Sequence, residues 1–173
     1  GAFPTSYIPT TSGPVTRAAD IVNLTGSALT TLQGAAASIV AEADYVNYAS
    51  RGATFVSYNN AGYVTAWITT AGVATFNPAV GVSVSTTNAA TSLNTPARTA
   101  VGYTINTSGS ITLNGGNVAQ VSGSFSAPTS IYLGSTGNDY YLNGHIRLIG
   151  VYNQRLSDTT LKTKSVAGSV LMR

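Results

Sequence analysis

Short runs in which apolar and polar residues alternate recur along this chain, and they constrain its fold more than any other feature. In the run 38–45, Ile39 and Ala41 fall on one face, and Glu42 and Asp44 fall on the other. A period of two is typical of a β-strand that buries one face. The sequence therefore predicts an all-β protein.

Similar runs are spread over the rest of the chain, separated by turn residues. We expect strands near 18–24, 38–45, 54–58, 63–69, 73–76, 80–84, 98–105, 110–113, 118–121, 131–134 and 145–152. The segments 59–62 (Asn-Asn-Ala-Gly) and 114–117 (Asn-Gly-Gly-Asn) suit hairpin turns, because Asn and Gly tolerate positive φ. Many short strands at this spacing favour a two-sheet sandwich.

One helix is expected near the C-terminus. Ser157 can cap it, Asp158 suits its first turn, and Lys162 and Lys164 lie near its end. Residues 26–34 are expected to form one short helical turn or a loop, because they are too few for a stable isolated helix.

The domain organisation follows from proline content and length. Pro4, Pro9 and Pro14 predict an extended arm over 1–14, because proline fixes φ and removes a donor. Residues 15–173 are then one domain.

The composition excludes several function classes. Charged residues are 8% of the chain, against roughly a quarter in a typical soluble domain. The net charge of +3 is scattered, so we expect no nucleic acid partner. The absence of cysteine excludes disulfides and thiolate metal sites, and no apolar run is long enough to span a membrane. The low charge suits an extracellular or virion surface.

Two stretches carry a resemblance to a known family. The first is 6–12 (Ser-Tyr-Ile-Pro-Thr-Thr-Ser) followed by 15–20, and the second is 141–147 (Tyr-Leu-Asn-Gly-His-Ile-Arg) followed by 155–158. They resemble the concanavalin A-like lectin/glucanase (LamG-like) domains of phage or prophage tail and structural proteins. The resemblance implies a two-sheet antiparallel jelly-roll sandwich with a short C-terminal helix. Lectins, glycosidases and structural domains all use this fold.

The hairpin 54–69 carries the strongest candidate binding face. A four-residue loop would pair Tyr58 with Tyr63, Val56 with Thr65, and Thr54 with Trp67. We therefore expect an open face that carries Tyr58, Tyr63, Thr65 and Trp67. Aromatic rings can stack on the apolar face of a sugar, and hydroxyls can bond to its OH groups. The alternative is that these aromatic side chains are packed or covered.

Arg98 is expected to lie opposite Val101 and Tyr103, with Ala100 and Gly102 beside it. These small neighbours would leave room for a ligand, and Arg98 would bind its polar or carboxylate groups. We expect Arg98 to belong to the same binding face as Tyr58, Tyr63 and Trp67.

Glu42 and Asp44 raise the question of catalysis. The glycosidase branch of the family uses a Glu-x-Asp-x-x-Glu strand, but Asn47 replaces the final acid here. Retaining chemistry needs two close carboxylates, one of them a general acid. We therefore expect no enzyme, and an acidic pair that is solvated or faces a ligand.

The loops offer weaker candidates. Tyr48, Arg51 and Tyr140 are candidate ligand contacts, with ordinary solvated loops as the alternative. Asn138, Asp139 and Asn143 could supply oxygen ligands for Ca²⁺. They include only one carboxylate, whereas Ca²⁺ usually binds six to eight oxygen ligands. We expect a structural role for His145, the single histidine.

These features favour a non-catalytic carbohydrate-binding module of a phage tail or virus-encoded protein. Its partner would be a polysaccharide or cell-surface glycan, and its location the virion or the extracellular space. The alternative is a structural tail domain that assembles with other virion chains or with itself. The third hypothesis is a glycoside hydrolase or lyase.

Overall fold

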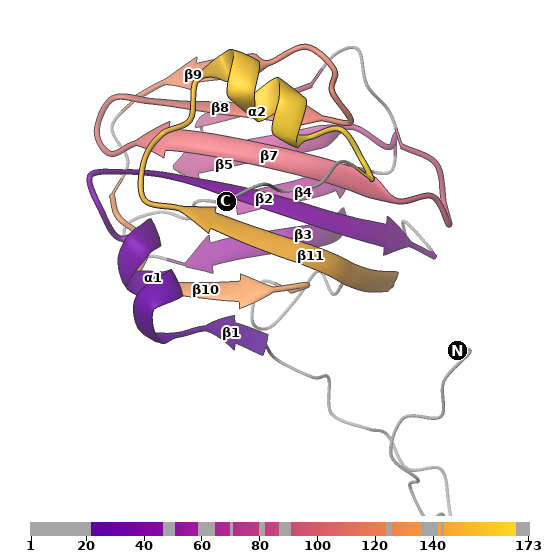
Figure 1. The fold of residues 1–173 in the computed structure, drawn as a ribbon, viewed down its shortest axis with the longest axis horizontal. Helices are drawn as coiled ribbons and strands as arrows, with labels where there is room; N and C mark the ends of the chain where they lie inside the picture. The colour runs from indigo at the N-terminus through magenta and orange to yellow at the C-terminus, as the bar shows by residue number, and fades with distance from the viewer. Residues whose placement is uncertain are drawn as a thin grey trace, which may run out of the picture.

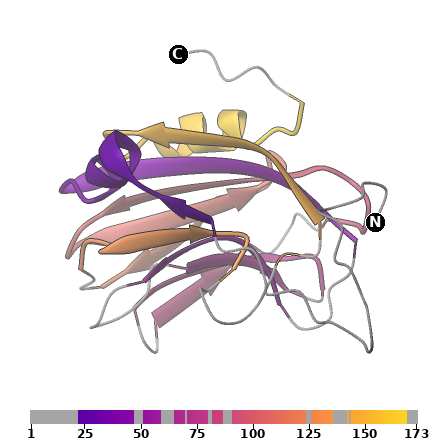
Figure 2. The same cartoon turned by 90° about the horizontal axis from the view of Figure 1, so that it is seen from below.

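Two antiparallel β-sheets pack face to face in this protein (Figures 1 and 2). The computed structural model describes residues 22–46, 51–58, 65–69, 71–79, 82–86, 91–123, 126–135, 142 and 144–168. Within these residues it contains eleven strands and two short helices. Neither helix is long and apolar enough to cross a membrane.

The sheets differ in size, and each mixes early and late parts of the chain. The six-stranded sheet has the order β1 (Val22–Leu24), β10 (Ser130–Leu133), β3 (Arg51–Tyr58), β4 (Thr65–Thr69), β5 (Ala74–Ala79) and β6 (Val82–Ser85). The five-stranded sheet has the order β11 (Gly144–Tyr152), β2 (Ala36–Tyr45), β7 (Ala97–Thr104), β8 (Ser108–Leu113) and β9 (Ala119–Ser122). All strand pairs in both sheets are antiparallel.

The core lies between the sheets and is built from alternate residues of their strands. Ile39 and Val101 come from the five-stranded sheet, and Ile68 and Phe76 come from the six-stranded sheet. Gly109 on β8 lies directly under the ring of Phe76, where a Cβ atom would collide with Cε1. The alternation expected for 38–45 is confirmed.

Helix α1 (Gly26–Leu32) closes one end of the sandwich (Figure 1). Its last residue, Leu32, is buried in the core, and the Tyr103 hydroxyl donates a 2.5 Å hydrogen bond to the Leu32 carbonyl. Burial raises the pKa of Tyr103 far above its ordinary value. Of the helical turn or loop expected near 26–34, the structure therefore has the helix, and Leu32 attaches it to the core.

Helix α2 (Asp158–Lys164) lies on the outer face of the five-stranded sheet (Figure 2). The Ser157 side chain accepts a 3.2 Å hydrogen bond from the Thr160 N–H, which is the cap that the sequence predicted. Leu156 and Leu161 pack with Val40 and Ala100 in a second apolar cluster.

Pairing differs from expectation in both hairpins. Val56 pairs with Thr65 as expected, but an irregularity between Ala53 and Phe55 makes Ala53 the partner of Trp67. In the other hairpin, Asn114 and Gly115 have the positive φ expected of a tight turn. The pairing nearest to that turn joins Ile111 to Ala119, so the connection is longer than four residues. The turn at 59–62 and the arm at 1–14 lie outside the described residues.

Candidate functional site

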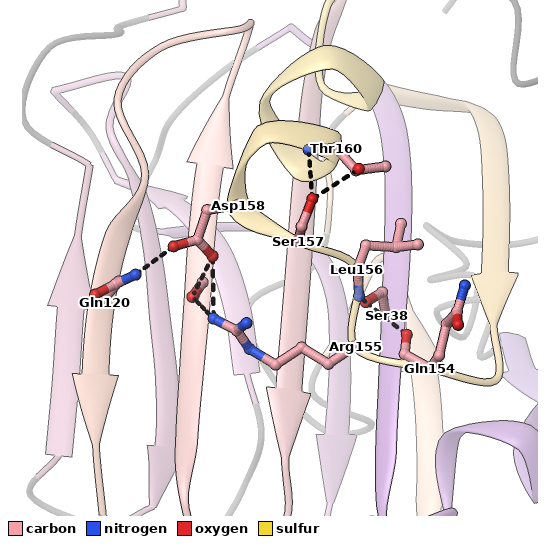
Figure 3. Close-up of polar contacts among 9 residues, drawn as sticks. Ser38, Gln120, Gln154, Arg155, Leu156, Ser157, Asp158 and Thr160 are labelled. Carbon is pink, nitrogen blue, oxygen red and sulfur yellow. Dashed lines mark hydrogen bonds and ion pairs between the residues drawn. The ribbon is translucent and has the colours of Figure 1, made fainter.

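A network of polar contacts fixes α2 and its preceding loop on the outer face of the five-stranded sheet (Figure 3). Arg155 Nη2 donates to Ser110 Oγ at 2.6 Å and to Asp158 Oδ1 at 3.0 Å, and Gln120 donates to the other oxygen of Asp158. Ser38 Oγ accepts from the Leu156 N–H at 2.9 Å. Two strands, β8 and β9, are therefore tied to Asp158 at the start of the helix, and β2 is tied to the loop that precedes it.

Arg98, expected to hold a ligand, is engaged within the protein. It is the register partner of Glu42, and its Nε and Nη2 atoms lie 2.8 Å and 2.7 Å from Glu42 Oε2. The Arg98 side chain is only 3% exposed, and its backbone N–H donates to Asn114 Oδ1. The expectation that Arg98 faces an open site is therefore wrong.

The room expected beside Arg98 is also filled. A Cβ atom on Gly102 would lie 3.0 Å from Ser38 Oγ, 3.1 Å from Leu161 Cδ1 and 3.3 Å from Arg155 Cγ. Ala100 is buried in the apolar cluster under α2. The small residues of β7 therefore accommodate the helix and its preceding loop.

Asp44 lies on the same outer face as Glu42 and pairs with β11. Its carboxylate accepts 3.0 Å hydrogen bonds from Arg147 Nη2 and from the His145 N–H. Burial opposes its ionisation, but the hydrogen bond from Arg147 and the backbone bond at His145 outweigh burial, so the pKa of Asp44 lies below its ordinary value. Arg147 and His145 are half or more exposed.

The outer face of the six-stranded sheet carries neither of the described helices (Figure 2). Trp67 lies on it, because its neighbours Ala66 and Ile68 belong to the core. Trp67 pairs with Thr75, whose hydroxyl lies 2.8 Å from that of Ser85 on β6. The Trp67 side chain is 9% exposed, so the open ring expected from the hairpin is not found.

Tyr132 on β10 is a more accessible aromatic residue on this face. Ile131 and Leu133 pack into the core, so Tyr132 points outward, and it is partly exposed. Its register partner on β1 is the exposed Asn23. Sequence reasoning missed Tyr132, although its alternation with Ile131 and Leu133 was a usable signal.

Trp67 and Arg98 do not share a site. Trp67 lies on the outer face of the six-stranded sheet, and Arg98 lies on the outer face of the other sheet, with the core between them. The expectation that one ligand-binding face carries both residues is therefore wrong.

The structure describes the remaining candidates only in part. Arg51 and Tyr58 lie in β3 and Thr65 lies in β4, where the backbone alone is described. The other candidates lie outside the described residues: Tyr48, Tyr63, Asn138, Asp139, Tyr140 and Asn143. The described part of the chain holds no group of three or more side chains suited to a metal ion.

Comparison with known proteins gives structural matches alone. No protein-family model matches the sequence, and none of the curated proteins matches it. The leech intramolecular trans-sialidase superposes over 82% of this chain, with a TM-score of 0.65 and 15% identity. This chain covers 24% of that enzyme's length.

Two sugar-binding domains also superpose. The CBM40 of a Ruminococcus gnavus IT-sialidase, bound to α2,6-sialyllactose, matches 79% of this chain and 86% of its own, with a TM-score of 0.62 and 18% identity. Domain 4 of a Geobacillus stearothermophilus extracellular arabinanase, bound to arabinotriose, matches 86% of this chain and 82% of its own, with a TM-score of 0.58 and 13% identity. The chain thus has the concanavalin A-like fold, as a two-sheet antiparallel sandwich with two short helices.

Proposed function

We propose that this protein is a non-catalytic carbohydrate-binding module that binds a polysaccharide or cell-surface glycan. The observation that carries the proposal is the outer face of the six-stranded sheet. It is free of both described helices, and it presents aromatic, hydroxyl and amide side chains. The accessible residues among them are Asn23, Asn77, Ser85 and Tyr132, whereas Trp67 and Thr75 on the same face are buried.

The chemistry of this face suits a sugar. Tyr132 combines an apolar ring with a hydroxyl, so it can pack on a sugar ring and form a hydrogen bond. Asn23 and Ser85 are exposed and can exchange hydrogen bonds with sugar OH groups. The fold supports the same proposal, because two structurally similar domains are described as bound to sialyllactose and to arabinotriose.

A non-catalytic role is supported by the state of the two carboxylates that resemble a glycosidase motif. Glu42 pairs with Arg98, and Asp44 pairs with Arg147. A general acid needs a pKa raised towards the working pH, whereas the pKa of Asp44 is lowered. Both carboxylates also lie on the sheet that α2 covers.

The biological setting that we propose is a phage tail or another virus-encoded protein, in the virion or outside the cell. Its support is the resemblance of the segments 6–12 and 141–147 to phage and prophage domains, together with the low proportion of charged residues. The module would attach its parent protein to a glycan.

A binding screen with matched variants tests the function. The panel contains α2,6-sialyllactose, arabinotriose and bacterial polysaccharides, and binding is measured by affinity electrophoresis and calorimetry. We expect Tyr132→Ala to weaken binding at least about tenfold, equivalent to ~1.4 kcal/mol. Tyr152→Ala is the control, because Tyr152 is a partly buried tyrosine beside α2. Equal binding by both variants, or no ligand in the panel, would contradict the proposal.

A structural role in assembly is the second candidate. Val22 is 52% exposed on β1, which is an edge strand of the six-stranded sheet. An apolar edge strand is a template for pairing with another chain. Light scattering that shows a defined homo-oligomer, dispersed by Val22→Lys, would support this role, and a monomer at all concentrations would count against it.

A further inference from the structure

The charged residues of this chain are divided unequally between the two layers of the sandwich. Every Asp, Glu, Lys or Arg whose side chain the structure describes belongs to the five-stranded sheet, to α2 or to the loop between them. These residues are Glu42, Asp44, Arg98, Arg147, Arg155, Asp158, Lys162 and Lys164. The six-stranded sheet contributes none of them.

The sequence extends this division beyond the described side chains. No charged residue or histidine occurs from Gly52 to Ala97, a range that contains β4, β5, β6 and nearly all of β3. The connections between these strands lie in the same range, so they also lack charge. The strands β1 and β10 are uncharged as well, which leaves Arg51 at the start of β3 as the single charged residue in the strands of this sheet.

We infer that the glycan bound by the outer face of the six-stranded sheet is an uncharged one, built from neutral sugars. This inference rests on the proposed function. A carboxylate is bound best by a cationic donor such as arginine, and its burial without such a donor is unfavourable. The hydroxyl and amide groups of Ser85 and Asn23 can match sugar hydroxyls without any charge.

The other layer shows where an acidic sugar would be attracted. Arg147 and His145 are 50% and 60% exposed beside Asp44. Both side chains lie on the five-stranded sheet, across the core from Tyr132, and Arg147 supplies the positive charge. An acidic glycan at this place would bind through solvent-exposed charges, so added salt would weaken its binding.

The first test compares ligands and salt. The ligands are arabinotriose and neutral polysaccharides on one side, and sialyllactose and acidic polysaccharides on the other. We expect neutral ligands to bind, with a dissociation constant that changes less than about twofold between roughly 0.05 and 0.5 M NaCl, because salt screens only charges. Preferential binding of acidic ligands that weakens with salt and is lost in Arg147→Ala would overturn the inference and leave the proposed function standing.

The second test places a charge on each face. Asn23→Glu puts a carboxylate beside Tyr132 on the outer face of the six-stranded sheet, and Ser122→Glu puts one on the outer face of β9 in the other sheet. We expect Asn23→Glu to weaken the binding of neutral ligands about tenfold, because its charge must be desolvated, and Ser122→Glu to leave that binding unchanged. Asn23→Ala controls for the loss of the amide group.

Equal effects of the two glutamate variants would overturn the placement of an uncharged site on the six-stranded sheet. Binding of no glycan of either kind would instead remove the proposed function, and the inference with it.

Discussion

Arg98 and Glu42 face each other across β7 and β2 and form an ion pair from which solvent is almost excluded. Their side chains are 3% and 12% exposed, and two guanidinium nitrogens approach one carboxylate oxygen. The Gly168 N–H also donates to that oxygen at 3.2 Å. The pair therefore joins two strands to the segment that follows α2.

Removal of one partner of this pair should be strongly destabilising. Glu42→Gln leaves a buried guanidinium without its counter-charge, and we expect the free energy of unfolding to fall by about 3–5 kcal/mol. The double variant Arg98→Met/Glu42→Leu should lose less than the sum of the losses in Arg98→Met and Glu42→Leu, because neither charge remains in it. Urea unfolding measures all four, and additive losses would contradict an energetic coupling between these residues.

Acid should weaken the attachment of β11 to β2 through Asp44. The pKa of Asp44 in the folded protein lies below the ordinary value of 3.8, so folding favours the ionised form. This stabilisation is present above that value and is lost as the pH falls through the lower folded pKa. The wild type should therefore lose more stability than Asp44→Asn when urea unfolding is compared at neutral and strongly acidic pH. Parallel profiles for the two proteins would contradict a lowered pKa.

Tyr103 should contribute through its hydroxyl as well as its ring. Tyr103→Phe keeps the ring but leaves the buried Leu32 carbonyl without this donor, so we expect a loss of about 1–3 kcal/mol. Tyr152→Phe is the control, since its hydroxyl has no described hydrogen bond. Chemical denaturation gives both values. A loss no larger than that of the control would show that the Leu32 carbonyl has another donor.

Gly109 should tolerate no side chain. Its position under Phe76 means that Gly109→Ala pushes the two sheets apart, and we expect a loss of about 1–3 kcal/mol. Phe76→Leu combined with Gly109→Ala should cost less than the two changes made separately, because the smaller side chain relieves the collision. Thermal unfolding of the single and double variants measures this coupling. If the loss in the double variant equals the sum of the two single losses, the collision with Phe76 is not the cause of the destabilisation.

Local chemistry allowed much of the fold to be predicted. The alternation in 38–45 gave the inner face of β2, and Ser157 gave the start of α2 because its cap depends on neighbouring residues alone. The Thr54–Trp67 pairing was wrong because an irregularity in β3 shifts the register between Ala53 and Phe55. Gly52 stands directly before the irregularity, and a glycine inside a strand is a known signal of a bulge that the alternation alone does not use.

The candidate site was less predictable because it depends on which sheet each strand joins. Alternation placed Arg98 away from the core correctly, but it could not show that α2 returns to cover that face. It could not separate Arg98 from Trp67 either, since strand order within the sheets is set by pairings far apart in sequence. The exposure of Tyr132 likewise depends on its place in β10, between β1 and β3.

Gly102 has a consequence for how a protein of this kind can diversify. A side chain at this position would press on Leu161 of α2, on Arg155 in the loop before it and on Ser38 of β2. The helix and the glycine are separated by more than fifty positions in the chain, yet the fit of each depends on the other. Recombination that keeps β7 and α2 from the same parent should therefore yield more stable chimaeras than recombination that separates them.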